Sequence, residues 1–271
     1  MYLTFGENAG SAVTAQRVAI ELEDGVAHVR LARSDKMNAL DPAMFDAIAA
    51  AGEKVRATGD IRAVVLSGDG RAFCAGLDTQ IFQHTGQDPV RINLISRTHG
   101  IANVVQHIVL QWRQLPVPVI AAVHGVAFGG GFQLALGADM RFVHPQTRLS
   151  IMEVRWGLVP DMAGMLLMRK LARPDVVADL TYSGRVFSGE EAHRYGFVTR
   201  LCTEPVAEAL LAAREIAGRS PEAIRAAKRI LAIDNQALAK RILQAEAVEQ
   251  SNLMGSPGQL EAIRSARPKN P

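Results

Sequence analysis

The sequence predicts an α/β fold that is followed by a helical C-terminal region. Short apolar runs alternate with amphipathic segments up to about residue 200, and helical patterns dominate after that point. Glycine, proline and aspartate turns separate the segments, and no internal repeat or low-complexity linker is evident. Such alternation is typical of a mostly parallel sheet whose strands are joined by right-handed crossovers.

The first expected element is a β-hairpin. Apolar residues alternate with polar or small ones over 18–22, Asp24-Gly25 is a hairpin turn, and a second strand covers 26–31. Asp41-Pro42 then begins a helix, because aspartate is a good N-cap and proline fits the first helical position. The apolar face of this helix repeats at helical spacing through Met44, Ile48, Ala51 and Val55.

The later elements follow the same signals. Further strands are expected over 63–66, 117–123, 140–143 and 148–151. Helices are expected within 90–115 (one long or two short), over 132–138, 162–171, 190–195 and 206–219, and in a long tail after Pro221. Ser188 and Glu191 form a capping box, and Gly196 ends that helix. The polar stretch 80–90 is expected to be a loop. We divide the chain into an N-terminal extension (1–16), a core (17–200) and a C-terminal helical region (201–271).

Composition and charge narrow the function classes. The longest apolar run, 117–128, is too short to span a bilayer and contains Pro118 and His124. Residues 1–16 lack the pattern of a secretory signal or a mitochondrial presequence, so we expect a cytoplasmic protein. Cys74 and Cys202 are far apart, as expected for free thiols in a reducing compartment.

The excess positive charge lies at the C-terminal end. Residues 1–220 hold 22 basic and 22 acidic side chains, whereas 221–271 hold eight and five, which accounts for the net charge of +3. A solvated helical surface and an anion-binding surface explain this equally well. A phosphate-rich small molecule fits as well as nucleic acid.

Two glycine-bearing turns are the strongest chemical signal. One is 72–78, which follows a predicted strand, and the other is Gly129-Gly130-Gly131, which opens a helix. Both can present free N–H groups, and two donors that converge on one oxygen make an oxyanion hole. The triple glycine also suits tight packing of a strand against a helix, and it matches neither the dinucleotide fingerprint nor the phosphate loop.

Four segments in this order resemble the enoyl-CoA hydratase/isomerase (crotonase) superfamily. They are A-F-C-A-G-L-D (72–78), V-P-V-I-A-A-V-H-G-V-A-F-G-G-G-F-Q-L-A-L-G-A-D (117–139), M-E-V-R-W-G-L-V-P-D-M-A-G (152–164) and S-G-R-V-F-S-G-E-E-A-H-R-Y-G-F-V (183–198). The resemblance runs from about Val18 to the C-terminal helices. It implies a ClpP/crotonase-like α/β fold of repeated ββα units with a helical C-terminal extension. It also implies a homotrimer or homohexamer, in which the C-terminal helices pack near the active site and over neighbouring subunits.

The resemblance also implies the substrate and its contacts. The substrate would be an acyl-CoA thioester, whose oxygen binds the N–H groups of Leu77 and Gly130. The expected CoA-binding residues are Lys36, Met37, Ala39, Ala75, Gly76, Asp78 and Gly129. The turn 36–40 would meet the adenine end of CoA, although the Lys36 side chain also reads as a solvated loop lysine. No cofactor is expected beyond the CoA of the substrate, and no metal, because the histidines show no metal-binding spacing.

One position departs from the hydratases of this superfamily. Those enzymes use two glutamates to hold water, pass its proton and protonate the substrate. Here the first position is Gln133, whose amide cannot titrate, and the second is Glu153. Members that shift double bonds work with one carboxylate at the second position. The resemblance therefore favours an enoyl-CoA isomerase (Δ3,Δ2 or dienoyl) with Glu153 as the single base.

Asp161 adds a second candidate acid. The spacing of Glu153, Gly157 and Asp161 resembles the dienoyl-CoA isomerase branch, although that branch usually also has an acid where Gln133 stands. N-capping of the next helix explains Asp161 equally well. The alternatives are an enoyl-CoA hydratase, other enolate chemistry on the same oxyanion hole, and an RNA-binding relative. Against RNA binding, the net charge is small and no aromatic-basic motif is present.

Overall fold

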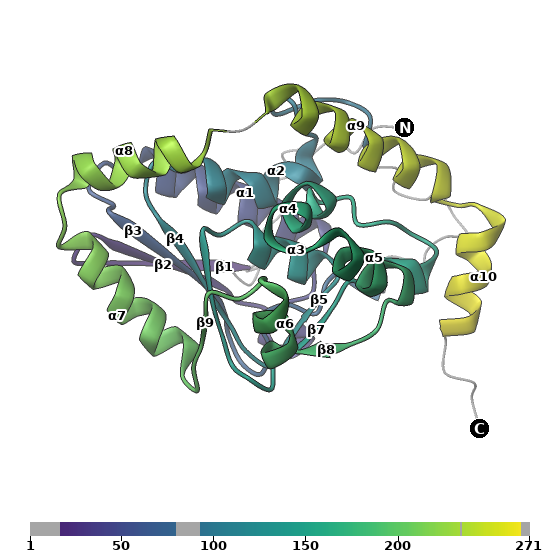
Figure 1. The fold of residues 1–271 in the computed structure, drawn as a ribbon, viewed down its shortest axis with the longest axis horizontal. Helices are drawn as coiled ribbons and strands as arrows, with labels where there is room; N and C mark the ends of the chain where they lie inside the picture. The colour runs from purple at the N-terminus through teal and green to yellow at the C-terminus, as the bar shows by residue number, and fades with distance from the viewer. Residues whose placement is uncertain (1–16, 80–92, 234, 267–271) are drawn as a thin grey trace, which may run out of the picture.

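A six-stranded sheet forms the centre of the fold in the computed structural model, which describes residues 17–79, 93–233 and 235–266 (Figure 1). The sheet has the order β1 (Val18–Glu23), β2 (Val26–Leu31), β3 (Ala63–Gly68), β4 (Val119–Val123), β6 (Met140–Val143) and β9 (Arg200–Leu201). Within this sheet, β1 and β2 pair antiparallel through the predicted turn, where Asp24 and Gly25 have φ values of 50° and 77°, and the other pairs of strands are parallel. Two positive φ values are typical of a type I′ hairpin turn.

A second, three-stranded sheet has the order β5 (Val126–Phe128), β7 (Arg148–Ser150) and β8 (Phe187–Ser188). The sequence predicted β7 but not β5 or β8; β8 has only two residues, too few to show an alternating pattern. The turn 74–76 runs beside β5: Cys74 N donates to Val126 O at 3.0 Å, and Phe128 N donates to Cys74 O at 3.1 Å. This pairing places the first glycine-bearing turn beside the second.

Helices cover both faces of the larger sheet (Figure 1). The helices of the described residues are, in chain order, α1 (Pro42–Ala57), α2 (Val104–Gln114), α3 (Gly130–Leu136), α4 (Gly164–Leu171), α5 (Pro174–Ser183), α6 (Gly189–Tyr195), α7 (Pro205–Ala217), α8 (Pro221–Leu231), α9 (Gln236–Leu253) and α10 (Pro257–Ala266). The predicted α/β class is confirmed. The division of the chain at residues 16 and 200 stays a prediction.

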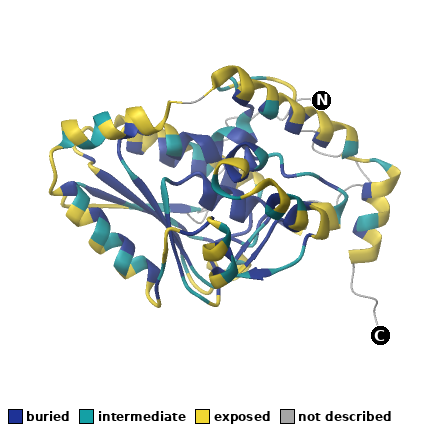
Figure 2. Ribbon diagram, viewed as in Figure 1, coloured by how far each residue is buried: buried dark blue, intermediate teal, exposed yellow. Residues whose placement is uncertain are grey.

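Two apolar clusters fill the two sides of the sheet, and Figure 2 shows the buried residues concentrated there. The larger cluster joins the strands to α1, α2 and α3 and includes the predicted face of α1. The smaller cluster packs the alanines of α7 against the opposite face of the sheet. Because α7 seals that face, the parallel strands are buried on both sides, as such sheets require.

Two helix predictions need correction. The segment 90–115 holds one described helix, which begins only at Val104, because Asn103 and Gln106 form a capping box there. The helix expected from residue 162 begins at Gly164. Its N-cap is Ala163, with φ of 62° and no side-chain cap, so the N-capping role considered for Asp161 is wrong. Residues 1–16 and the whole of the loop expected over 80–90 lie outside the described residues.

Candidate functional site

The two glycine-bearing turns meet at one place. A Cβ atom added to Gly76 would lie 2.5 Å from Phe128 O and 3.7 Å from the backbone nitrogen of Gly130. Leu40 pairs with the first turn, since Leu40 N donates to Gly76 O and Asp78 N donates to Leu40 O. In that parallel bridge the backbone N–H of Leu77 points away from Leu40. Leu77 is exposed, and Gly130 is the first residue of α3, so within the described part of the chain neither N–H group takes part in the backbone pairing of the two turns.

The turn that carries the expected CoA contacts is held by one buried amide. Asn38 Oδ1 accepts from Arg33 N at 2.9 Å, and Nδ2 donates to the carbonyls of Asp69, Ala72 and Phe73 at 2.9–3.2 Å. Asn38 has a positive φ of 55°, which asparagine tolerates better than most residues. One side chain thus joins the segment 33–40 to the first glycine-bearing turn, 72–78.

We expect Asn38→Ala to lower the free energy of unfolding by about 3 kcal/mol, because it leaves several buried polar groups unpaired. Urea denaturation followed by circular dichroism measures this change. Asp35→Ala, an exposed residue of the same turn, is the control and should stay within about 0.5 kcal/mol of wild type. Equal stability of the two variants would contradict the structural role of Asn38.

Other expected CoA contacts lie in the same two segments, 33–40 and 72–78. Lys36 is exposed in η1 (Ser34–Lys36), and Met37 follows with a left-handed φ of 50°. Met37 O accepts from Ala75 N at 2.9 Å. Ala39 and Asp78 are buried, and the Asp78 carboxylate accepts from Arg33 Nη1 at 2.6 Å. Asp78 therefore has a structural ionic partner within the protein.

Glu153 and Gln133 form the centre of the site. Glu153 opens η3 (Glu153–Trp156), Gln133 lies on α3, and both are buried. Gln133 Nε2 donates to Glu153 Oε1 at 2.6 Å. A Cβ atom on Gly129 would lie 3.1 Å from the same carboxylate oxygen, so the triple glycine also makes room for Glu153. The structure therefore brings the candidate base beside the candidate oxyanion donor Gly130.

The orientation of the Gln133 amide is determined by the backbone. Its Oε1 accepts from Met162 N at 2.9 Å and from Gly164 N at 3.0 Å. The oxygen must face these two donors, so the NH₂ group must face Glu153. Gln133 therefore acts as a donor to the carboxylate and holds one of its two oxygens.

Three carboxyl groups in this region have raised pKa values. Burial raises the pKa of Glu153 to about 7, although the hydrogen bond from Gln133 acts in the opposite direction. Burial and then the charges of Glu246 and Glu153 raise the pKa of Asp161 well above its ordinary value. Burial also raises the pKa of Glu246, on α9, to about 7. Clusters of strongly shifted carboxyls are typical of functional sites.

Sequence reasoning missed Glu246. Its Oε2 accepts from Ala163 N at 3.0 Å and its Oε1 accepts from Met165 N at 3.0 Å, so it contacts the segment that follows Asp161. One feature of α9 could have identified it. Glu246 and Gln250 are polar residues at buried positions of a helix whose other buried residues are mostly apolar. Buried polar side chains need partners, and both of these bind the 159–166 segment.

Cys74 lies in the first glycine-bearing turn, 72–78, but is unsuited to nucleophilic chemistry. It is fully buried, and burial raises the pKa of its thiol to about 12. Among the described residues, no group of three or more His, Cys, Asp or Glu side chains could hold a metal ion. None of the described helices combines the length and apolar character needed to cross a membrane.

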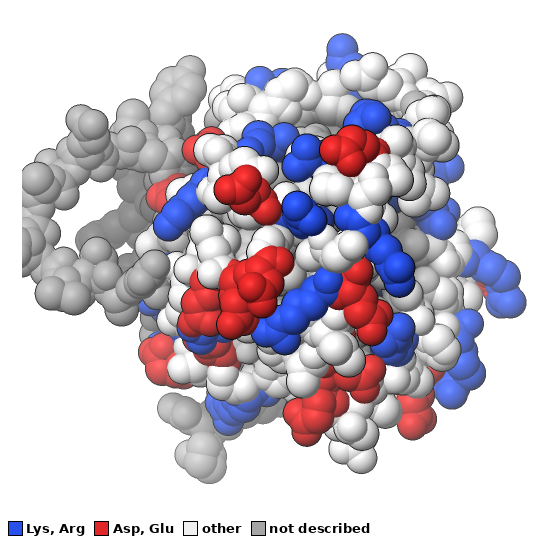
Figure 3. Space-filling view, turned by 90° about the vertical axis from the view of Figure 1, so that its left-hand side faces the viewer, with Lys and Arg blue, Asp and Glu red and all other residues white. Residues whose placement is uncertain are grey.

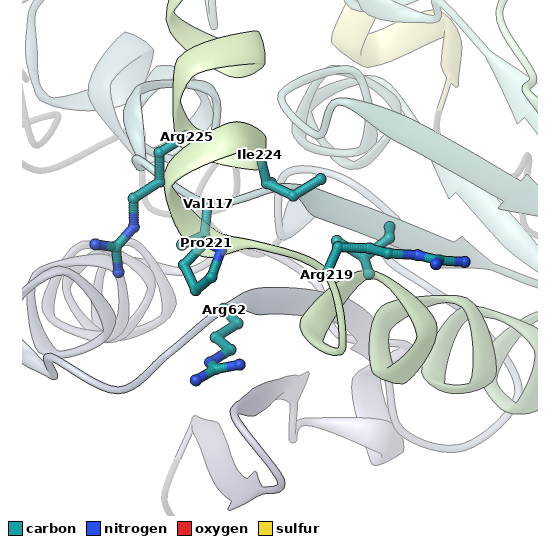
Figure 4. Close-up of a pocket in the computed structure, with 7 residues that line it drawn as sticks. Arg62, Val117, Arg219, Pro221, Ile224 and Arg225 are labelled. Atoms are coloured by element: carbon teal, nitrogen blue, oxygen red, sulfur yellow. The ribbon is translucent and has the colours of Figure 1, made fainter.

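A separate small cleft lies between α7, α8 and the segments before β3 and β4 (Figure 4). Its lining residues are Arg62, Val117, Ile216, Arg219, Pro221, Ile224 and Arg225. Arg219 points away from Arg62 and Arg225, so the three guanidinium groups do not converge on one point. On the side of the molecule that carries α7 and α8, basic and acidic side chains are intermixed without a broad basic patch (Figure 3). Nucleic-acid binding gains no support from this side.

Comparisons with known proteins point to one family. The family model described as enoyl-CoA hydratase/isomerase matches residues 21–263. The mitochondrial Delta(3,5)-Delta(2,4)-dienoyl-CoA isomerase of Mus musculus is 32% identical over 217 residues, which cover 75% of this chain and 64% of that protein. The (E)-benzylidenesuccinyl-CoA hydratase of Thauera aromatica is 31% identical over 215 residues, with 78% and 80% covered.

A solved structure supports the fold. The crystal structure of an enoyl-CoA hydratase/isomerase from Mycobacterium paratuberculosis superposes with a TM-score of 0.82 at 22% identity, covering 94% of this chain and 100% of that one. At that identity the likeness concerns the fold alone. The relatives with similar sequences include both an isomerase and a hydratase, so their names do not decide between the two reactions.

Proposed function

Since the chain belongs to the enoyl-CoA hydratase/isomerase family, we propose that it moves a double bond within an acyl-CoA thioester. Glu153 carries the proton, and the N–H groups of Leu77 and Gly130 stabilise the enolate. The observation that carries this proposal is the hydrogen bond from Gln133 to Glu153, because it places an amide where hydration would need a second acid.

The two oxygens of Glu153 have different surroundings. Oε1 accepts from Gln133, whereas Oε2 is buried and accepts no hydrogen bond from any described residue. Oε2 is therefore the oxygen available to remove a proton from substrate. A carboxyl with a pKa of about 7 suits a group that must take a proton and then return it.

The proposed reaction moves one proton, which passes from the substrate to Glu153 and back to the substrate. The carboxylate removes a proton from C2 of a 3-enoyl thioester, and the electrons of that C–H bond shift to give a dienolate with charge on the thioester oxygen. Two N–H donors aimed at that oxygen stabilise the dienolate. The protonated Glu153 then returns the proton to C4, which leaves a 2-enoyl product and the original carboxylate.

Asp161 fits the role of a second proton carrier for a longer conjugated system. Burial and the charges of Glu246 and Glu153 raise its pKa well above the ordinary value, and burial raises the pKa of Glu153 to about 7. A carboxyl whose pKa is raised can hold a proton and donate it as a general acid. In a 3,5-dienoyl thioester the distal carbon is C6, farther from the base that acts on C2. Asp161 would deliver its own proton to C6, and proton exchange with solvent would then return Glu153 to the carboxylate and Asp161 to the acid.

We expect Asp161→Asn to lower kcat on a 3,5-dienoyl-CoA by about 10²-fold, because removal of a general acid typically costs that much. The rate on a 3-enoyl-CoA should fall much less, since Glu153 alone can serve it. Initial rates on the two substrates, followed by ultraviolet absorbance, measure the difference. Equal losses on both substrates would contradict a separate role for Asp161.

The proposal is tested by incubating the protein with 2-enoyl-, 3-enoyl- and 3,5-dienoyl-CoA and following the products by mass and absorbance. Double-bond movement without a gain in mass is the expected result. Addition of one water to the 2-enoyl substrate as the main reaction would make the protein a hydratase despite Gln133. If all three substrates bind without change, the site supports a different enolate reaction.

Assembly and location are further proposals. Ile230 and Leu231 at the end of α8, and Ile233 after it, are 68–81% exposed, which is unusual for large apolar residues on a monomer. We propose that they lie in the interface of a homotrimer or homohexamer. The cytoplasmic location stays the prediction from the sequence.

A further inference from the structure

The N-terminus of α4 is capped by two side chains that are distant in sequence. Its N-cap, Ala163, has a left-handed φ and no side chain that can accept a hydrogen bond. Gln133 Oε1 accepts from Met162 N and Gly164 N, and Glu246 accepts from Ala163 N and Met165 N. Free N–H groups at a helix N-terminus need such acceptors. Four successive donors are therefore divided between a residue of the candidate site and a residue of α9.

The Glu246 carboxylate is well matched to this task. Its Oε1 accepts from Met165 N at 3.0 Å and from Leu166 N at 3.4 Å, and its Oε2 accepts from Ala163 N at 3.0 Å. Oε2 also accepts from Gln106 Nε2 at 3.1 Å. The side chain is only 5% exposed, and a negative charge is favoured at the positive end of a helix dipole.

Glu246 is itself anchored on the opposite side. Gln106 Nε2 also donates to Leu243 O at 2.8 Å, and Gln106 Oε1 accepts from Arg97 Nη1 at 3.1 Å. Gln106 belongs to the capping box that begins α2. The carboxylate is thus held between the start of α2 and the start of α4, and it has little freedom to move.

We propose that Glu246 is a positioning residue for the reaction: it holds the 161–166 segment so that Gln133 keeps its amide directed at Glu153. The inference rests on the proposed function in one respect, the role of Glu153 as the base. The Gln133 amide has its orientation because Met162 N and Gly164 N face its oxygen. If the segment moves, those donors are lost and the amide can rotate, which would bring its oxygen toward the Glu153 carboxylate.

The C-terminal region therefore takes part in the structure of the site. Through Glu246, α9 contributes to the geometry of a base and its donor on η3 and α3. Gln250, one turn later on α9, supports the same segment by accepting from Val159 N at 3.0 Å. A shift of about 1 Å in a catalytic group can lower a rate by roughly 10²-fold.

Glu246→Gln tests the proposal, because the amide has the same shape but its NH₂ group must face backbone N–H donors. Glu249→Gln is the matched control, since Glu249 lies on the same helix and is exposed. We expect Glu246→Gln to lower kcat by about 10- to 100-fold while KM for the thioester stays within about twofold. Amide hydrogen exchange in 161–166 should become faster in this variant and stay unchanged in the control.

A double variant shows whether Glu246 acts through Gln133. If it does, Glu246→Gln combined with Gln133→Ala should lose less activity than the product of the two single losses. Multiplicative losses, or a kcat for Glu246→Gln equal to that of the control, would overturn the proposal. Unchanged hydrogen exchange in 161–166 would also overturn it, whatever the activity of the wild-type protein. If the wild-type protein converts no enoyl thioester, that result alone counts against the proposed function and not against the positioning of the segment.

Discussion

Glu153→Gln is expected to lower kcat for double-bond movement by about 10²–10⁴-fold, the loss that follows removal of a general base. The substitution keeps the size of the side chain and removes only its ability to take and return a proton. KM for the thioester should change little, because the proposed oxyanion donors are backbone N–H groups and the proposed CoA contacts lie elsewhere. Stopped-flow absorbance on a 3-enoyl-CoA measures the change.

The pH dependence of kcat is a second test of the role of Glu153. Burial raises the pKa of Glu153 to about 7, and only the ionised carboxylate can remove a proton. The wild-type kcat should therefore fall as the pH decreases through about 7 and level off above it. Glu53→Gln, an exposed glutamate on α1, should reproduce the wild-type profile. A Glu153→Gln variant with a kcat within a few-fold of wild type would show that another group is the base.

Gly76→Ala is expected to lower kcat by about 10²–10³-fold, the usual loss when an oxyanion donor is displaced. Gly76 has φ of +86°, and a Cβ atom there would lie 2.5 Å from Phe128 O. Either the turn or the Phe128 carbonyl must move. Both movements change the spacing between the N–H groups of Leu77 and Gly130.

Gly100→Ala is the matched control for this substitution. Gly100 also has a positive φ, +65°, but a Cβ atom there would meet no atom of the described residues within 4 Å. The control therefore contains the backbone strain without the steric clash. A folded Gly76→Ala variant with the kcat of Gly100→Ala would contradict the proposed convergence of the two turns. Circular dichroism and thermal unfolding show whether each variant is folded.

The fold was predictable where local patterns and turn chemistry agree. The β1–β2 hairpin, α1 with its Asp41 cap, and α6 between its capping box and Gly196 were all predicted and are confirmed. The short strands β5, β8 and β9 and the helix α5 were not predicted. The short strands depend on pairing between distant segments, which a period in the local sequence does not reveal.

The candidate site was predictable only in part. The motifs identified Glu153, Gln133 and the two glycine-bearing turns, and the structure brings these together. The orientation of the Gln133 amide was not predictable, because it depends on two backbone donors about 30 residues away. The N-cap of α4 also differed from expectation, since Ala163 takes a left-handed φ there, which is unusual for a non-glycine residue.

The most direct test of the central claim is the fate of oxygen when the wild-type protein acts on a 3-enoyl-CoA in water enriched in heavy oxygen. Proton movement by Glu153 predicts a product whose double bond has moved and which contains no heavy oxygen. Incorporation of heavy oxygen as fast as the double bond moves would contradict the account. It would show that the site adds water, and that a group other than Gln133 handles the second proton.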